Sequence, residues 1–135
     1  METEEKIPFD PALDVNRKVF DYIKNLHCHS DISDVFEEGM KPCGDVQFYS
    51  PDNYRYLTAS TQNIIFAFAA GTDTIAFRLN KKMKMIAIET GGRDFSECGE
   101  DWVRFTLFRN DWPKTDLEFW SLKAYVGIRE KVGLA

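Results

Sequence analysis

The densest group of potential metal ligands in the sequence is His27, Cys28 and His29, which Asp31 follows closely. Zinc sites take ligands spaced so that one turn or knuckle presents a pair. The two histidines are separated by a single residue, so on a helix they would point in different directions. Cys43 would have to complete the site from the far end of a loop. The spacing favours a helix end packed with these side chains, and we expect no bound metal and no other cofactor.

A second group of chemically capable residues lies in the polar segment from Gly91 to Asp101, GGRDFSECGED. Converging carboxylates could perform acid–base chemistry or bind a hard cation. The spacing matches neither an EF-hand nor a glycine-rich phosphate loop, and the negative charge would repel phosphate. The alternative is a solvated loop. If the segment faces a pocket against a sheet, the lining residues would be Arg78, Arg93, Asp94, Glu97, Asp101, Trp102 and Arg104.

The cysteines, at positions 28, 43 and 98, do not indicate catalysis or a disulfide framework. Cys98 follows Glu97 in an acidic stretch, and neighbouring carboxylates raise the pKa of a thiol, which makes it less reactive. Cys28 has no base placed for it by the spacing. An odd number of cysteines without close pairs is typical of a reducing compartment, so we expect a cytoplasmic protein.

Composition and charge exclude several broad classes of protein. The chain has 135 residues, of which 44% are apolar and 14% aromatic, and its formal net charge is −5. This aromatic content is too high for a disordered chain, and the acidic balance argues against a general nucleic-acid binder. No apolar run is long enough to span a membrane, and no export signal is visible. We expect one domain over residues 1–135, with residues 1–7 as a flexible tail.

The segment from Asn63 to Asn80, NIIFAFAAGTDTIAFRLN, is predicted to form a β-hairpin at the centre of the core, because two apolar runs flank a short glycine-containing turn. We place Ala70 opposite Asp73. Since side chains alternate along a strand, this register puts the large residues on one face and mainly alanines on the other. The large pairs would be Phe68 with Ile75, Phe66 with Phe77, and Ile64 with Leu79.

The remaining elements follow from periodicity and from turn and capping residues. Asp10 and Pro11 start an amphipathic helix that we extend to about His27, and Thr115 with Glu118 has the spacing of a capping box for a C-terminal helix. A short helix is expected between residues 31 and 39. Further strands are expected at Val46–Ser50, Tyr54–Ser60, Met83–Thr90 and Trp102–Phe108.

Short connections between these strands favour an antiparallel meander. The predicted fold is therefore an α+β domain with about six strands in an antiparallel sheet, flanked by an N-terminal and a C-terminal helix in two layers. A half-closed barrel around one helix is the alternative. The predicted C-terminal helix carries a second apolar stripe on the side away from its main apolar face, and this stripe needs a partner of its own.

Apolar surface in excess of what two layers need points to an interaction partner. In a two-layer fold the alanine face of the hairpin would be uncovered, although a solvated face should be polar. Either a helix covers it or another chain does. The predicted interface consists of Ala67, Ala69, Ala76, Phe119, Leu122 and Val126.

The sequence therefore predicts a non-catalytic protein-interaction or neutralising-partner module that self-associates. We expect no nucleic-acid partner and no membrane partner. The alternative is a small-ligand-binding protein or enzyme whose pocket lies between the sheet and the loop of residues 91–101.

Overall fold

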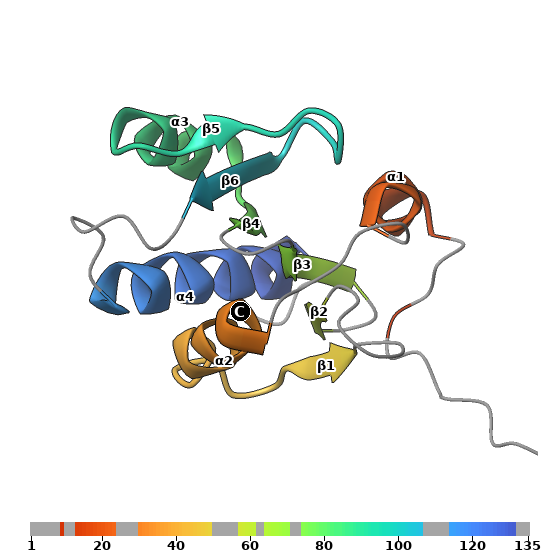
Figure 1. Cartoon of the computed structure of the whole chain (residues 1–135). Coiled ribbons are helices and arrows are strands. Elements are labelled where there is room, and N and C mark those ends of the chain that lie inside the picture. The colour runs from red at the N-terminus through yellow and green to blue at the C-terminus, as the bar shows by residue number, and fades with distance from the viewer. Residues whose placement is uncertain are drawn as a thin grey trace, which may run out of the picture.

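The computed structural model describes residue 9 and residues 13–23, 30–49, 57–61, 64–70, 74–106 and 114–131. Helices and an antiparallel sheet share this part of the chain, so the α+β class is confirmed (Figure 1). In chain order the elements are α1 (Asp14–Ile23), α2 (Ser30–Gly39), β1 (Gln47–Tyr49), β2 (Leu57–Thr61), β3 (Ile64–Ala70), β4 (Thr74–Arg78), α3 (Lys81–Glu89), β5 (Arg93–Asp94), β6 (Trp102–Thr106) and α4 (Lys114–Lys131).

The strands form one sheet in the order β1-β2-β3-β4-β6-β5, and every pair of neighbours is antiparallel. Strands β1 to β4 follow one another as a meander. The connection from β4 to β6 contains α3 and β5, and β5 pairs with the outer edge of β6. The sheet therefore grows in chain order except at this insertion.

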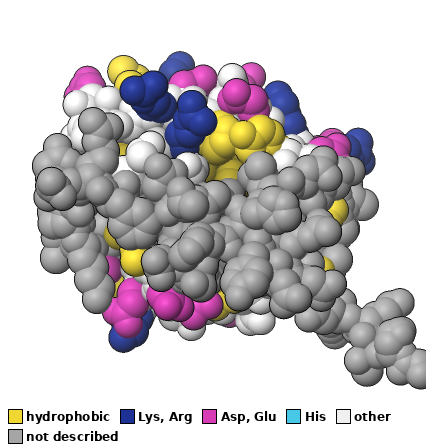
Figure 2. Space-filling model, in the orientation of Figure 1, with side chains coloured by type: hydrophobic (Ala, Val, Ile, Leu, Met, Phe, Trp, Pro, Cys, Tyr) yellow, Lys and Arg dark blue, Asp and Glu magenta, His cyan; other side chains and the backbone are white. Residues whose placement is uncertain are grey.

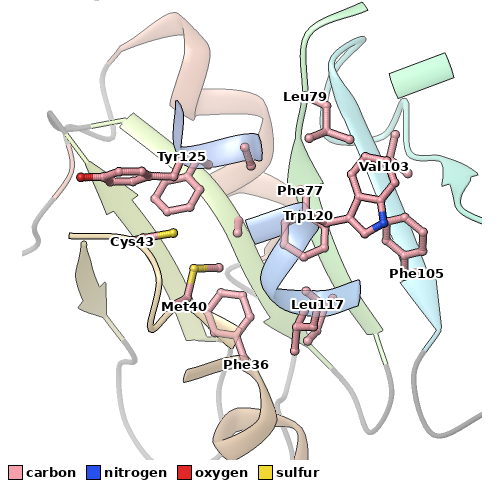
Figure 3. Close-up of a cluster of buried hydrophobic side chains, with 14 of the residues drawn as sticks. Phe36, Met40, Cys43, Phe77, Leu79, Val103, Phe105, Leu117, Trp120 and Tyr125 are labelled. Carbon is pink, nitrogen blue, oxygen red and sulfur yellow. The ribbon is translucent and has the colours of Figure 1, made fainter. Parts of the chain in front are cut away.

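Helices pack on both faces of the sheet, so the predicted two-layer arrangement is wrong. Figure 1 shows β3 between α4 and α1. One face meets α2, α3 and α4, and we call the buried residues there the α4-side core (Figure 3). They are Phe36, Met40, Cys43, Phe66, Ala67, Ala69, Ile75, Phe77, Leu79, Ala87, Val103, Phe105, Leu117, Trp120, Ala124, Tyr125 and Ile128.

The other face meets α1 and the loop that follows β5. We call its buried residues the α1-side core, and they are Phe9, Val19, Ile23, Ile65, Phe68, Ala76, Phe95, Cys98 and Trp102. The apolar stripe of α1 thus packs on one face of the sheet, and the main apolar stripe of α4 packs on the other. Strands that are buried on both faces have nearly continuous apolar sequences, and the sequence of β3, IIFAFAA, is of this kind.

The register of the central hairpin differs by one residue from the prediction. Ala70 pairs with Thr74, not with Asp73, which puts Phe68 opposite Ala76 and Ala67 opposite Phe77. Consequently Phe68 lies in the α1-side core, whereas Ile75 lies in the α4-side core. A shift of one residue exchanges the faces of a strand, and that exchange is tolerated here because both faces are buried.

A β-bulge in β3 restores one part of the predicted pattern. The pairing with β2 shifts between Ala59, opposite Ala67, and Ser60, opposite Ile65, which leaves Phe66 as the extra residue. Phe66 and Ala67 therefore both belong to the α4-side core. The prediction that Phe66 and Phe77 share an interior is confirmed, although the predicted pairing of these two residues is wrong.

Two buried polar side chains bond the backbone of Ile65 beside the bulge. The pairing of β3 with β4 ends at Ala67 and Phe77, so Ile65 lies beyond it. Its N–H donates to Asn16 Oδ1 at 2.9 Å, and its carbonyl accepts a bond from Arg78 Nε at 3.0 Å. A buried backbone group without a partner costs about 1–3 kcal/mol, so these two side chains stabilise the interrupted strand.

Replacing Asn16 with alanine is expected to lower the free energy of unfolding by about 1–3 kcal/mol, because the Ile65 N–H would be left buried without its acceptor. Urea denaturation measures the change. The control is Arg17→Ala: Arg17 lies next to Asn16 but is exposed and pairs with Asp14 at 3.5 Å, an interaction whose loss costs about 0–1 kcal/mol. Equal effects of the two substitutions would contradict the role assigned to Asn16.

The segment predicted as a strand from Met83 to Thr90 is helix α3. Asn80 caps the helix, since its side-chain oxygen accepts a bond from the Met83 N–H at 2.8 Å. Lysine, methionine and alanine are good helix formers, and one side chain of α3, Ala87, is buried against the sheet. The segment from Met83 to Ile88 is a short, mostly apolar run, and such a run does not by itself distinguish a strand from a helix.

The other predicted helices lie where they were expected, with different bounds. The N-terminal helix is described from Asp14 to Ile23, within the predicted range, and α2 covers Ser30 to Gly39. Helix α4 begins at Lys114, one residue before the predicted cap at Thr115.

Candidate functional site

The acidic loop of residues 91–101 is anchored to α3 by a lysine. Lys84 Nζ lies 2.5 Å from Asp94 Oδ1 and also donates to the carbonyl of Glu100. The hydrogen bond from Lys84 lowers the pKa of Asp94. Arg93 and Asp94 form β5 opposite Arg104 and Val103. These charges therefore hold the loop in place, and this contact brings no second carboxylate beside Asp94.

Part of the space between this loop and the sheet is filled by the loop's own apolar side chains. Phe95 and Cys98 are each 2% exposed and belong to the α1-side core. Phe95 meets the ring of Tyr22 on α1 at 5.1 Å, and Arg104 stacks over Phe95 at 5.1 Å. Glu97 and Arg93 are exposed at the surface. Phe95 and Cys98 therefore fill the space between the loop and the sheet at the positions where they lie.

A pocket of about 410 Å³ lies where β4 ends and α3 begins. The end of the acidic loop forms a second side, and the last turns of α4 form a third. Of the residues predicted as pocket lining, Arg78 and Asp101 are brought together here. The complete lining is Arg78, Leu79, Asn80, Lys81, Asp101, Gly127, Ile128 and Glu130.

Arg78 is a lining residue of this pocket, and its buried side chain is directed toward the α1-side core. It is 8% exposed, its Cζ lies 5.0 Å from the centre of the Trp102 ring, and its Nε bonds the Ile65 carbonyl. Burial lowers the pKa of Arg78 to about 10, while the charge of Asp101 acts in the opposite direction. The loop end is fixed beside it, because the Leu79 N–H donates to the Asp101 carbonyl at 2.8 Å. Arg78 therefore remains protonated at neutral pH in a defined position.

Sequence reasoning missed the part of the pocket that the helices supply. Lys81 opens α3, and Glu130 lies in the last turn of α4. Gly127 lies on α4 about one turn before Glu130, and a Cβ placed there would meet no atom within 4 Å. A glycine inside a helix costs about 1 kcal/mol relative to alanine, and this glycine was the one signal in the sequence that pointed to open space.

The remaining chemically capable residues do not form a reactive centre in the described part of the chain. Burial raises the pKa of Cys43 and that of Cys98 to about 12, and Glu97 adds to the effect on Cys98. Both thiols are therefore protonated and packed as apolar groups. Among the described residues, no group of at least three histidines, cysteines and carboxylates is placed to hold a metal ion. The predicted cluster of His27, Cys28 and His29 lies outside them.

The predicted interface divides into a buried part and an exposed part. Ala67, Ala69 and Ala76 are fully buried, and they lie on two faces of the sheet rather than one. The helices cover both faces, so these alanines offer no docking surface. The α4 residues of the predicted interface are exposed: Phe119 by 46%, Leu122 by 37% and Val126 by 39%.

Helix α3 adds apolar surface that the sequence did not reveal, because the segment was taken for a strand. Met85 is 58% exposed, Ile86 37% and Ile88 42%. Figure 2 shows hydrophobic side chains among basic and acidic ones over the top of the molecule, where α3 and β5 lie. Helices α3 and α4 both pack on the α4-side core, so both present apolar side chains outward from the same face of the sheet.

Comparison with protein-family models, with curated proteins and with solved structures gave no match. In the described part of the chain, no helix has the length and apolar character needed to cross a membrane.

Proposed function

We propose that the protein is a non-catalytic interaction module that self-associates through the outer face of α4, with α3 at the margin of the interface. The observation that carries this proposal is the stripe formed by Phe119, Leu122 and Val126. These residues are spaced along one side of α4, opposite the side that Leu117, Trp120, Ala124 and Ile128 bury against the sheet. An apolar stripe on an otherwise packed helix is typical of a protein interface.

Phe119 has the properties of an interface anchor. Its ring meets the ring of Trp120 edge-on at 4.9 Å, and Lys123 Nζ lies 5.5 Å over it. Trp120 is itself 4% exposed and packs against Phe105. The Phe119 ring is therefore held against the core before any partner binds, which reduces the entropy lost on association.

The arrangement of the stripe favours a second copy of the chain as the partner. Leu122 lies between Phe119 and Val126, so two antiparallel α4 helices can place Leu122 near a two-fold axis and bury both ends of each stripe. Glu118 and Lys123 flank the stripe with opposite charges. In an antiparallel two-fold pair each flank faces the same flank of the partner, so these two charges do not favour this orientation, and the symmetric spacing of the stripe carries it.

The test is the substitution Leu122→Lys followed by sedimentation velocity over a range of concentrations. Burying a leucine contributes about 1.5–3 kcal/mol, and a two-fold interface contains the residue twice, so we expect the dimer to dissociate at least about 100-fold more readily. Lysine and leucine have similar helix propensities, so α4 itself should remain intact.

Leu13→Lys is the matched control. Leu13 is 37% exposed, the same fraction as Leu122, but it immediately precedes α1, which packs on the opposite face of the sheet. This variant should sediment like the unsubstituted protein. A protein that stays monomeric at high concentration, or a dimer that Leu122→Lys leaves unchanged, would refute self-association through α4.

A further inference from the structure

We propose that the pocket between the start of α3 and the end of α4 binds a small zwitterion whose opposite charges are separated by a short apolar linker. The pocket volume, about 410 Å³, falls within the range of small-molecule sites, roughly 300–1,000 Å³. Charged side chains of both signs line it, with Lys81 at the start of α3 and with Asp101 and Glu130. A ligand with a single charge would meet attraction from one sign and repulsion from the other.

The basic side of the pocket consists of Lys81 and the beginning of α3. The buried Arg78 side chain contacts the Ile65 carbonyl and the Trp102 ring on the α1 side of the sheet, so we do not count its charge among those that meet a ligand. Lys81 is exposed in the first turn of α3, which contains no acidic residue. A lysine at the positive end of a helix dipole is locally unfavourable. A carboxylate bound here would relieve that repulsion.

The acidic side of the pocket consists of Asp101, Glu130 and the end of α4. Glu130 is exposed in the last turn of α4, where a negative charge faces the negative end of the helix dipole. Asp101 is positioned by its backbone, since its carbonyl accepts the Leu79 N–H. An ammonium group bound here would relieve the repulsion at this helix end. Arg129 lies next to Glu130 in this turn and pairs with Asp45 at 3.3 Å, so this helix end carries charges of both signs. Lys81 and Glu130 are charges of opposite sign that the two ends of one zwitterion would meet.

The linker would lie over apolar side chains between these two sides. Leu79 is 2% exposed and Ile128 is 3% exposed, and both line the pocket. Gly127 leaves the space above them open, because no atom lies within 4 Å of a Cβ built at this position. Any larger residue at 127 would extend into the volume that the linker needs.

Isothermal titration calorimetry with ε-aminocaproate tests the ligand class. Two matched probes lack one charge each: caproate has no ammonium group, and n-pentylamine has no carboxylate. We expect ε-aminocaproate to bind at least about tenfold more tightly than either probe, because each charged end forms its own charge-assisted contacts. Absence of detectable ε-aminocaproate binding, or equal affinity for the three compounds, would overturn the proposal.

Substitutions in α4 test the location. Gly127→Leu places a side chain in the pocket without a steric clash at its Cβ and should weaken ε-aminocaproate binding at least about tenfold. The control is Val126→Leu, which adds a leucine at the neighbouring position on the outer face and should change affinity less than about twofold. Tight binding that survives Gly127→Leu would show that the ligand lies elsewhere and would overturn the assignment of this pocket.

Charge substitutions at the exposed rim test the two sides separately. Lys81→Gln should weaken caproate binding and Glu130→Gln should weaken n-pentylamine binding, each with a loss of about tenfold in affinity for ε-aminocaproate. The reverse pattern, or no effect of either substitution, would contradict the orientation proposed for the zwitterion. Circular dichroism of each variant shows whether the fold is retained.

Discussion

Trp102→Ala is expected to lower the free energy of unfolding by about 3–5 kcal/mol, the usual cost of truncating a buried aromatic residue. Trp102 is fully buried at the start of β6. Its ring lies 5.4 Å from that of Phe68 and 5.0 Å from Arg78 Cζ. Alanine would remove the centre of the α1-side core and would also leave Arg78 without its aromatic partner. Guanidinium chloride denaturation gives the change directly.

Trp102→Phe is the informative companion variant. Trp102 Nε1 is buried and has no hydrogen-bond partner among the described residues, so phenylalanine removes an unsatisfied polar group while keeping an aromatic ring for Phe68 and Arg78. Loss of the second indole ring leaves a small cavity, and we expect a net cost below about 1.5 kcal/mol. A loss as large as that of the alanine variant would mean that the full indole, rather than any aromatic ring at this position, is needed to fill this core.

Gly99 explains why the indole fits where it does. A Cβ on Gly99 would lie 3.3 Å from Trp102 Cδ1, and its φ of +140° is one that other residues rarely adopt. The backbone N–H of Trp102 donates to the Gly99 carbonyl at 3.2 Å. The acidic loop therefore turns tightly over Trp102. In the sequence this glycine looked like one of several in a polar loop, and nothing in its spacing revealed what it packs against.

Most strands of the sheet could be predicted from the sequence, whereas β5, the register and the layers around the sheet could not. The apolar runs on either side of Gly71 are long, rich in aromatic and β-branched residues, and separated by a turn, which identifies β3 and β4. The register is set by the number of turn residues between Ala70 and Thr74, the pair closest to the turn. Beside the bulge at Phe66, the Ile65 N–H donates to Asn16, which is distant in sequence. Such long-range contacts leave no local pattern.

The alanines show why surface predictions from a strand pattern are weak. Ala67 and Ala69 are small because α2 and α4 pack closely over β3, and Ala76 is small because Phe68 lies opposite it and fills the other face. A sequence of small residues indicates close packing. It does not distinguish a helix of the same chain from a second protein. The exposure of the α4 stripe could be predicted from the sequence, because α4 buries only one of its sides against the core.

The candidate pocket was predicted in part, for a physical reason. Arg78 and Asp101 are adjacent to the ends of neighbouring strands, so their proximity follows once β4 and β6 are paired. Lys81 and Glu130 come from helices, and their proximity depends on α3 lying beside α4 on the same face of the sheet. Because the α3 segment was taken for a strand, no argument from the sequence could bring these two residues together.

Arg78→Met is expected to lower the free energy of unfolding by about 3 kcal/mol, combining the loss of a hydrogen bond from a charged donor with the loss of a desolvated cation–π contact. Methionine retains most of the apolar stem of arginine and can still contact Trp102. It cannot donate to the Ile65 carbonyl, which would remain buried beside the bulge without the 3.0 Å bond from Arg78. Urea denaturation, with near-UV circular dichroism as a probe of Trp102, measures the effect.

Arg104→Met separates the two contributions. Arg104 lies on the same face of the sheet as Arg78 and stacks on Phe95 at 5.1 Å, close to the 5.0 Å between Arg78 and Trp102. It is partly exposed, whereas Arg78 is 8% exposed. An exposed cation–π contact contributes about 0.5–1 kcal/mol, so Arg104→Met should cost no more than that. If the two arginines prove equally costly to replace, stacking alone accounts for Arg78, and the Ile65 carbonyl does not depend on it. If Arg78→Met costs several times more, the bond from the buried guanidinium to the Ile65 carbonyl stabilises β3 at its bulge.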